Sequence, residues 1–127
     1  MRLPIAVLAC AVAGFPLWEP IHAAEDAVAP VRSPGDLSEA ERVQMMQSAN
    51  RYHACLYEQA LAEIDADDDI RAIADLAMGH CQPQLDQLEA MISGWGIDRN
   101  FAAGFARSMR DRGARRLLPE LAVEKSR

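Results

Sequence analysis

Apolar and polar positions between residues 37 and 118 repeat with the period of an α-helix. Three segments show this pattern, at about residues 38–64, 69–93 and 98–118, and two short polar or glycine-containing turns separate them. At 100° per residue, each segment gathers its apolar side chains on one face and most of its charged side chains opposite. The pattern predicts an all-α protein, a small bundle of three helices in which the first two form an antiparallel hairpin.

The predicted helix starts carry capping residues. Ser38 followed by Glu41 has the spacing of a capping box, in which each side chain accepts a hydrogen bond from the other residue's backbone N–H. Asp67 or Asp68 is expected to cap the second helix, and Asp98 the third, because acidic side chains suit the partial positive charge of exposed N–H groups.

Two prolines bear on the helix boundaries. Pro83 lies inside the second segment and cannot donate to the carbonyl of Gly79, but the apolar stripe keeps its phase across it, which favours a kink over a break. Pro119 is expected to end the third helix. We therefore expect residues 37–119 to form the helical domain and residues 120–127 to form a fraying tail.

The apolar face of the first segment is broad. It is expected to pack against the other two helices and to supply much of the core, with methionine filling irregular gaps. Its predicted members are Met45, Met46, Ala49, Tyr52, His53, Leu56, Tyr57, Ala60 and Ile64.

The first 24 residues have the features of a secretory signal peptide. Arg2 gives a basic start, residues 3–18 are uncharged, and small residues permit cleavage after Ala23 or Ala24. An uncleaved membrane anchor is less favoured because the run is short and flanked by prolines. A lipoprotein acylated on Cys10 is a further alternative. We expect a periplasmic or secreted protein with no stable membrane anchor after cleavage.

About 100 residues remain after cleavage, enough for one domain with one modest core. Residues 25–36 contain two prolines and a glycine without apolar periodicity, which predicts a flexible N-terminal arm. The formal net charge of −6 argues against nucleic acid as a partner.

Removal of the leader would leave two cysteines, Cys55 and Cys81, and an even number in an exported chain favours a disulfide. If the helical hairpin turns near residues 66–67, a rise of about 1.5 Å per residue places the two within about 5 Å of the same level. Cys81 lies on the apolar stripe and Cys55 at the edge of the opposing face. The pairing Cys55–Cys81 is therefore predicted.

Metal binding and cysteine chemistry are less favoured interpretations of the same residues. His53 and Cys55 are two residues apart, and His80 and Cys81 are adjacent, so neither pair points in one direction on a helix. The acidic run at residues 65–69 begins like a calcium loop but lacks its glycine and its final glutamate. We therefore predict no metal site, no cofactor and no thiol nucleophile.

The third helix carries a cluster of arginines opposed only by Asp111, whereas residues 36–89 contain twelve acids and three arginines. The favoured interpretation is internal: the basic helix docks on the acidic hairpin. The alternative is a surface for an anionic partner, since Arg112 and Arg116 fall at the edge of the apolar face. The cluster comprises Arg107, Arg110, Arg112, Arg115 and Arg116.

No paired carboxylate, nucleophile motif or phosphate-binding loop stands at a recognisable spacing, so we expect a binding protein and not an enzyme. The leading hypothesis is a small exported accessory protein with an unidentified protein partner, which could also form a homodimer. One alternative is an acid- or stress-responsive chaperone that exposes its methionines. A second is an enzyme that uses His53 or His80 as acid or base.

Overall fold

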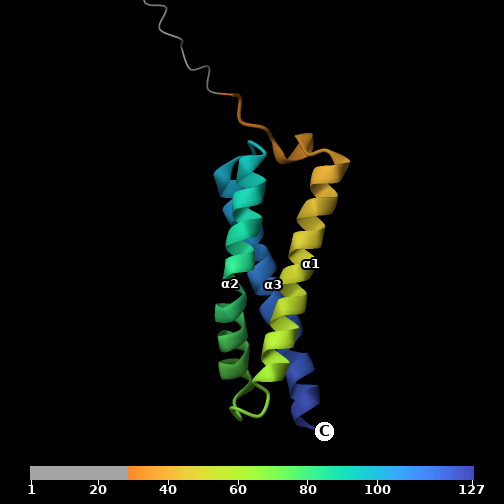
Figure 1. The fold of residues 1–127 in the computed structure, drawn as a ribbon, viewed down its shortest axis with the longest axis vertical. Coiled ribbons are helices and arrows are strands. Elements are labelled where there is room, and N and C mark those ends of the chain that lie inside the picture. The colour runs from red at the N-terminus through yellow and green to blue at the C-terminus, as the bar shows by residue number, and fades with distance from the viewer. Residues whose placement is uncertain (1–28) are drawn as a thin grey trace, which may run out of the picture.

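Three long helices form the part of the chain that the structure, a computed structural model, describes, namely residues 29–127. Helix α1 spans Glu39–Ala62, α2 spans Ile70–Gly94 and α3 spans Arg99–Lys125, and a short 3-10 helix, η1, covers Pro34–Asp36. They run down, up and down along one long axis in the view of Figure 1. The predicted all-α three-helix bundle is confirmed. The predicted signal peptide and Cys10 lie outside the described residues.

Each of the three long helices begins at a residue whose side chain caps it. Ser38 Oγ accepts a hydrogen bond from the Glu41 N–H at 3.2 Å, and Glu41 Oε2 accepts one from the Ser38 N–H at 2.7 Å, which confirms the capping box. Asp98 caps α3 as predicted. The cap of α2 is Asp69, later than predicted, because the Asp67 carboxylate accepts from the Asp69 N–H inside the turn.

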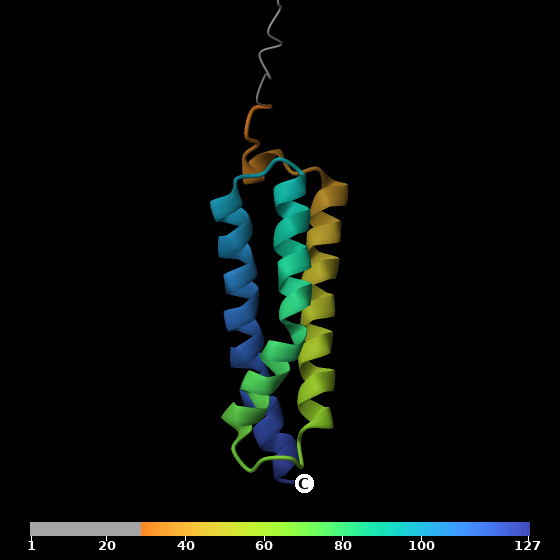
Figure 2. The ribbon, with the colours of Figure 1, turned by 60° about the vertical axis from the view of Figure 1, so that its left-hand side comes forward.

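Pro83 lies within α2 and does not end it. Proline cannot donate a backbone hydrogen bond and its ring crowds the preceding turn, so the helix bends instead of continuing straight. Figure 2 shows this predicted kink, with the green first part of α2 inclined to the teal second part. The buried stripe continues across it, since Ala77 before the bend and Leu85 after it are both buried.

The core lies along the axis of the bundle and is built mostly from small and aliphatic side chains. On α1 the buried face is narrower than predicted: Met46 and Tyr57 are 52% and 37% exposed, and His53 is only half-buried. Met46, His53 and Tyr57 lie on the flank of α1 that lines the hollows between α1 and α3. The buried residues of α1 are Ser48, Ala49, Tyr52, Leu56 and Ala60.

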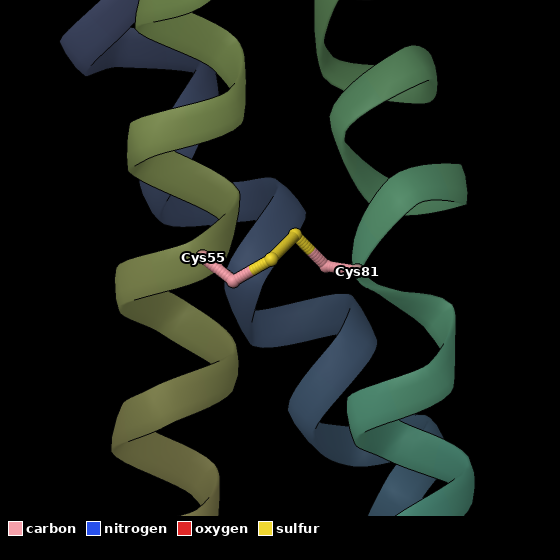
Figure 3. Close-up of a disulfide and its surroundings, with 2 residues drawn as sticks. All are labelled: Cys55 and Cys81. Atoms are coloured by element: carbon pink, nitrogen blue, oxygen red, sulfur yellow. A yellow bond between two sulfur atoms is a disulfide. The ribbon is translucent and has the colours of Figure 1, made fainter.

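A disulfide between Cys55 and Cys81 joins α1 to α2, as predicted. The two Cα atoms are 6.0 Å apart, and Figure 3 shows the side chains extending toward each other from the two helices. Because the cross-link closes a loop with a sequence separation of 26, the chain-entropy relation gives it about 3.5 kcal/mol of stabilisation.

Helix α3 continues past Pro119 to Lys125, whereas the sequence pattern predicted an end at Leu118 and a fraying tail. Leu121 is fully buried in the core, and Lys125 Nζ reaches Asp68 Oδ1 at 3.4 Å. Burial of a leucine side chain stabilises by about 1.5–3 kcal/mol, an amount comparable with the roughly 3 kcal/mol that an internal proline costs. Tertiary packing therefore extends the helix through the proline.

Residues 29–36 are the described part of the predicted N-terminal arm, and Arg32 anchors them. Its guanidinium donates to both carboxylate oxygens of Glu41, at 2.8 and 3.0 Å, and to the backbone oxygens of Trp95 and Asp36. Its backbone N–H donates to the Gly96 oxygen at 2.8 Å. These bonds tie the segment before α1 to the turn between α2 and α3.

Candidate binding surface

The five arginines of the predicted surface are all exposed on α3, but they do not form one patch. Arg107 and Arg110 line a shallow groove between α2 and α3, where Asp86 and Glu89 lie opposite them. The other three arginines line a groove on the other side of α3, between α3 and α1. The cluster therefore divides into an acid-facing pair and a second group: Arg112, Arg115 and Arg116.

None of the five arginines forms an ion pair with any residue in the range 29–127. The favoured interpretation is that the basic helix docks on the acidic hairpin, and α3 does pack against it, with Arg107 and Arg110 opposite Asp86 and Glu89, but without ion pairs over this range. The physical reason is direction: α3 docks through Ala102, Ala106 and Met109, which are buried, and this leaves the arginines on the flanks. Among the described residues that line the groove on the α1–α3 side, Glu120 is the one carboxylate.

The α1–α3 groove consists of two hollows of about 280 and 260 Å³ that meet at His53 and Arg116. In the larger hollow, Met46 and Asn50 of α1 face Arg112 and Arg115 of α3. In the smaller one, Tyr57 of α1 lies with Leu117 and Glu120 of α3. We call these two hollows together the α1–α3 groove.

Gly113 sets the shape of this groove. A Cβ atom at Gly113 would lie 2.5 Å from Leu56 Cδ1 and 3.3 Å from a ring carbon of Tyr52, so only a glycine lets α3 approach α1 at this level. Toward the start of both helices they stand apart, as both ribbon views show (Figures 1 and 2). The close contact at Gly113 and the divergence above it leave the groove open to solvent.

His53 stands where the two hollows meet, and its ring lies 5.7 Å from that of Tyr52, centroid to centroid. Burial lowers its pKa below the ordinary value of 6.5, and the positive charges of Arg116 and Arg112 lower it further. The ring is therefore held neutral at neutral pH, and a proton added to it would stand beside two guanidinium groups.

The other residues considered for chemistry are dispersed. His80 is exposed on α2, beside a Cys81 whose sulfur is in the disulfide. Residues 29–127 contain no group of three or more histidine, cysteine, aspartate or glutamate side chains placed to hold a metal ion. Asp67 and Asp69 use their carboxylates to fix the turn before α2. His53 and His80 stand on different faces and do not form one site.

Two features of this region could not be predicted from the sequence. Gly113 is one of four glycines in the second half of the chain that stand within helices, and nothing in the sequence marks it as the contact with α1. The Tyr52 hydroxyl is buried without a hydrogen-bond partner among the described residues, and burial raises its pKa. Their importance comes from neighbours more than fifty residues away or on another helix.

Comparison of the chain with protein-family models, with curated proteins and with solved structures finds no match. Within the described part of the chain, no helix combines the length and apolar character needed to cross a membrane.

Proposed function

We propose that this chain is a small exported binding protein, an accessory or adaptor protein of the periplasm, whose α1–α3 groove receives a protein partner. One observation carries the proposal: Arg112, Arg115 and Arg116 lack ion pairs within residues 29–127 and stand beside the exposed side chains of Met46 and Tyr57. Arginine, methionine and tyrosine are enriched at protein interfaces, where a guanidinium gains most from a carboxylate supplied by the partner.

Export is supported by the leader and by the disulfide. A basic start, an uncharged run and a small-residue exit are typical of signal peptides, and the Cys55–Cys81 cross-link is of the kind that persists in oxidising compartments. Cell fractionation followed by N-terminal sequencing tests this part. We expect a mature chain that begins at Ala24 or Glu25 in the periplasmic fraction, and full-length protein in the cytoplasm would contradict it.

The helical scaffold suits a binding protein because the groove is built on helices and not on loops. The disulfide fixes α1 to α2, and Ala102, Ala106 and Met109 bury α3 against them. The backbone of packed helices loses little freedom when a partner docks, which lowers the entropy penalty of association. The proposed function requires recognition only, with no reacting group.

Photo-crosslinking in the native host tests the groove. A photoreactive residue at Asn50, inside the groove, is compared with one at Asp75, exposed on α2. We expect one discrete heteromeric adduct from position 50 and none from position 75. The adduct should disappear in Arg112→Glu/Arg116→Glu with the circular dichroism spectrum unchanged. The same adducts from both positions would contradict a specific surface.

A second candidate function is an acid-responsive chaperone, and His53 is the observation that favours it. The groups that face this ring are Arg112 and Arg116 of α3, with Glu120 lining the same hollow and the Tyr52 ring tilted beside it. Because the folded-state pKa is lowered, the unfolded chain binds a proton more readily as the pH falls below 6.5. Stability is therefore lost in acid, and separation of α1 from α3 would expose buried methionine.

Hydrophobic-dye binding between about pH 7 and pH 3 distinguishes the two candidates. A chaperone of this kind should bind more dye and protect an unfolding client from aggregation at low pH, and His53→Gln should shift the midpoint of this change. Constant dye binding over the whole range would eliminate the chaperone and leave the constitutive binding protein.

A further inference from the structure

We infer that the partner segment received by the α1–α3 groove is an acidic amphipathic helix of about four turns. The inference rests on the proposed function, because it specifies what the same groove binds. It is drawn from three properties of the groove: a row of side chains at helical spacing beside the buried face of α1, which we call the second seam, an excess of positive charge along α3, and a shape bounded by two helices.

The second seam flanks the buried face of α1. Its members are spaced by alternating steps of three and four residues, which is the spacing by which one helix contacts another along its length. From residue 43 to residue 57 the helix rises about 21 Å, or about four turns. The seam comprises Val43, Met46, Asn50, His53 and Tyr57; the last four line the two hollows, Val43 continues the row beyond them, and Val43 and Met46 are each about half exposed.

The opposite wall of the groove is basic. Arg112, Arg115 and Arg116 line it, against Glu120 in the same groove and Asp111 beside them on α3, which leaves a local excess of positive charge on a chain of formal net charge −6. A local excess of positive charge attracts a carboxylate-bearing surface and repels another basic one. The charge therefore selects an acidic occupant.

A second copy of this chain fits the groove poorly. A two-fold symmetric contact through this face would place the same three arginines of each copy against each other, which is destabilising. The acidic turn at residues 65–69 of another copy offers carboxylates but is not itself a helix four turns long. The occupant is accordingly a different protein.

The spacing of the arginines defines the occupant further. Arg112 and Arg116 lie four residues apart, one turn along the same flank of α3. Two carboxylates one helical turn apart, at positions i and i+4 of the partner, match that separation and permit a charge-assisted hydrogen bond to each guanidinium. An apolar stripe on the partner helix then contacts Met46 and Tyr57, as in other helix-in-groove complexes.

A synthetic helix tests the inference directly. The probe is a fluorescent peptide of 18 residues with a leucine stripe at heptad spacing and glutamates flanking it at i and i+4, and its matched control has every glutamate replaced by lysine. We expect fluorescence anisotropy to detect saturable binding of the glutamate peptide to the mature oxidised protein. Binding should weaken as salt is raised, because salt screens exposed charge pairs.

Two variants of equal charge locate the site. Arg112→Glu/Arg116→Glu and Arg107→Glu/Arg110→Glu each change the formal net charge from −6 to −10. Only the first variant alters the α1–α3 groove. We expect it to weaken binding of the glutamate peptide by about tenfold or more. We also expect it to bind the lysine peptide more tightly than the second variant does. Equal losses in both variants would overturn the inference, since they would indicate non-specific attraction.

Other occupants give different results, and each would overturn the inference. Self-association of the wild type that is abolished in the first variant would assign the groove to a second copy. Binding to anionic phospholipid vesicles, without binding to the glutamate peptide, would assign it to a membrane surface. If neither peptide binds but the adduct at position 50 still forms in cells, the groove receives a protein of another chemistry. The proposed function then stands and the inference fails.

Discussion

Replacement of Gly113 by alanine tests how the contact between α1 and α3 is built. The new Cβ would lie 2.5 Å from Leu56 Cδ1, a distance at which Leu56 or the helix must move. Leu56 is buried, so its methyl group has little free space to enter. Insertion of a methyl group into a packed core costs about 1–3 kcal/mol.

Gly104→Ala on the same helix is the matched control, because nothing lies within 4 Å of a Cβ at that position. Alanine in place of glycine inside a helix stabilises by about 0.5–1 kcal/mol, and this gain is common to both variants. We therefore expect Gly104→Ala to stabilise and Gly113→Ala to destabilise by about 1 kcal/mol. The difference between them, about 1–3 kcal/mol, isolates the steric term.

Urea unfolding of the oxidised protein, followed by circular dichroism at 222 nm, measures both free energies of unfolding. A double-mutant cycle adds a further check, since removal of the Leu56 side chain removes the clash. In the Leu56→Ala background, Gly113→Ala should become neutral or stabilising, even though Leu56→Ala alone costs about 2–5 kcal/mol. Equal stabilisation by Gly113→Ala and Gly104→Ala in the wild-type background would refute the proposed close contact.

Three further predictions concern the stability of the helical scaffold. Reduction of Cys55–Cys81 should lower the free energy of unfolding by about 3.5 kcal/mol in urea titrations, and no change would contradict its role. Leu121→Ala should cost about 2–5 kcal/mol, whereas a fraying tail would make it neutral. The Arg32 guanidinium and the Ser38 backbone N–H lower the pKa of Glu41 from 4.5 to about 2, so its contribution is present above pH 4.5 and lost as the pH falls toward 2. The wild type should therefore have a higher melting temperature than Glu41→Gln at pH 7, and the difference should vanish near pH 2; a constant difference would contradict this.

The helices, the starts of α1 and α3 and the disulfide follow from local rules. Ser38 and Asp98 cap helices because a short polar side chain reaches its own next turn, and that geometry is fixed within four residues. The pairing of Cys55 with Cys81 needs only the rise per residue and the position of one turn. Three candidate segments with helical periodicity were therefore enough to predict the fold class.

The sequence by itself thus determined an acidic, three-helix chain with a cross-linked hairpin, because propensity, capping and periodicity act between residues that are close along the chain. The tertiary structure decided the rest. It carried α3 through Pro119 by burying Leu121, and it left Arg112 and Arg116 without ion pairs in the described range. Those outcomes depend on the rotation and separation of helices, and at Gly113 these are set by whether one methyl group fits between side chains that are distant in the sequence.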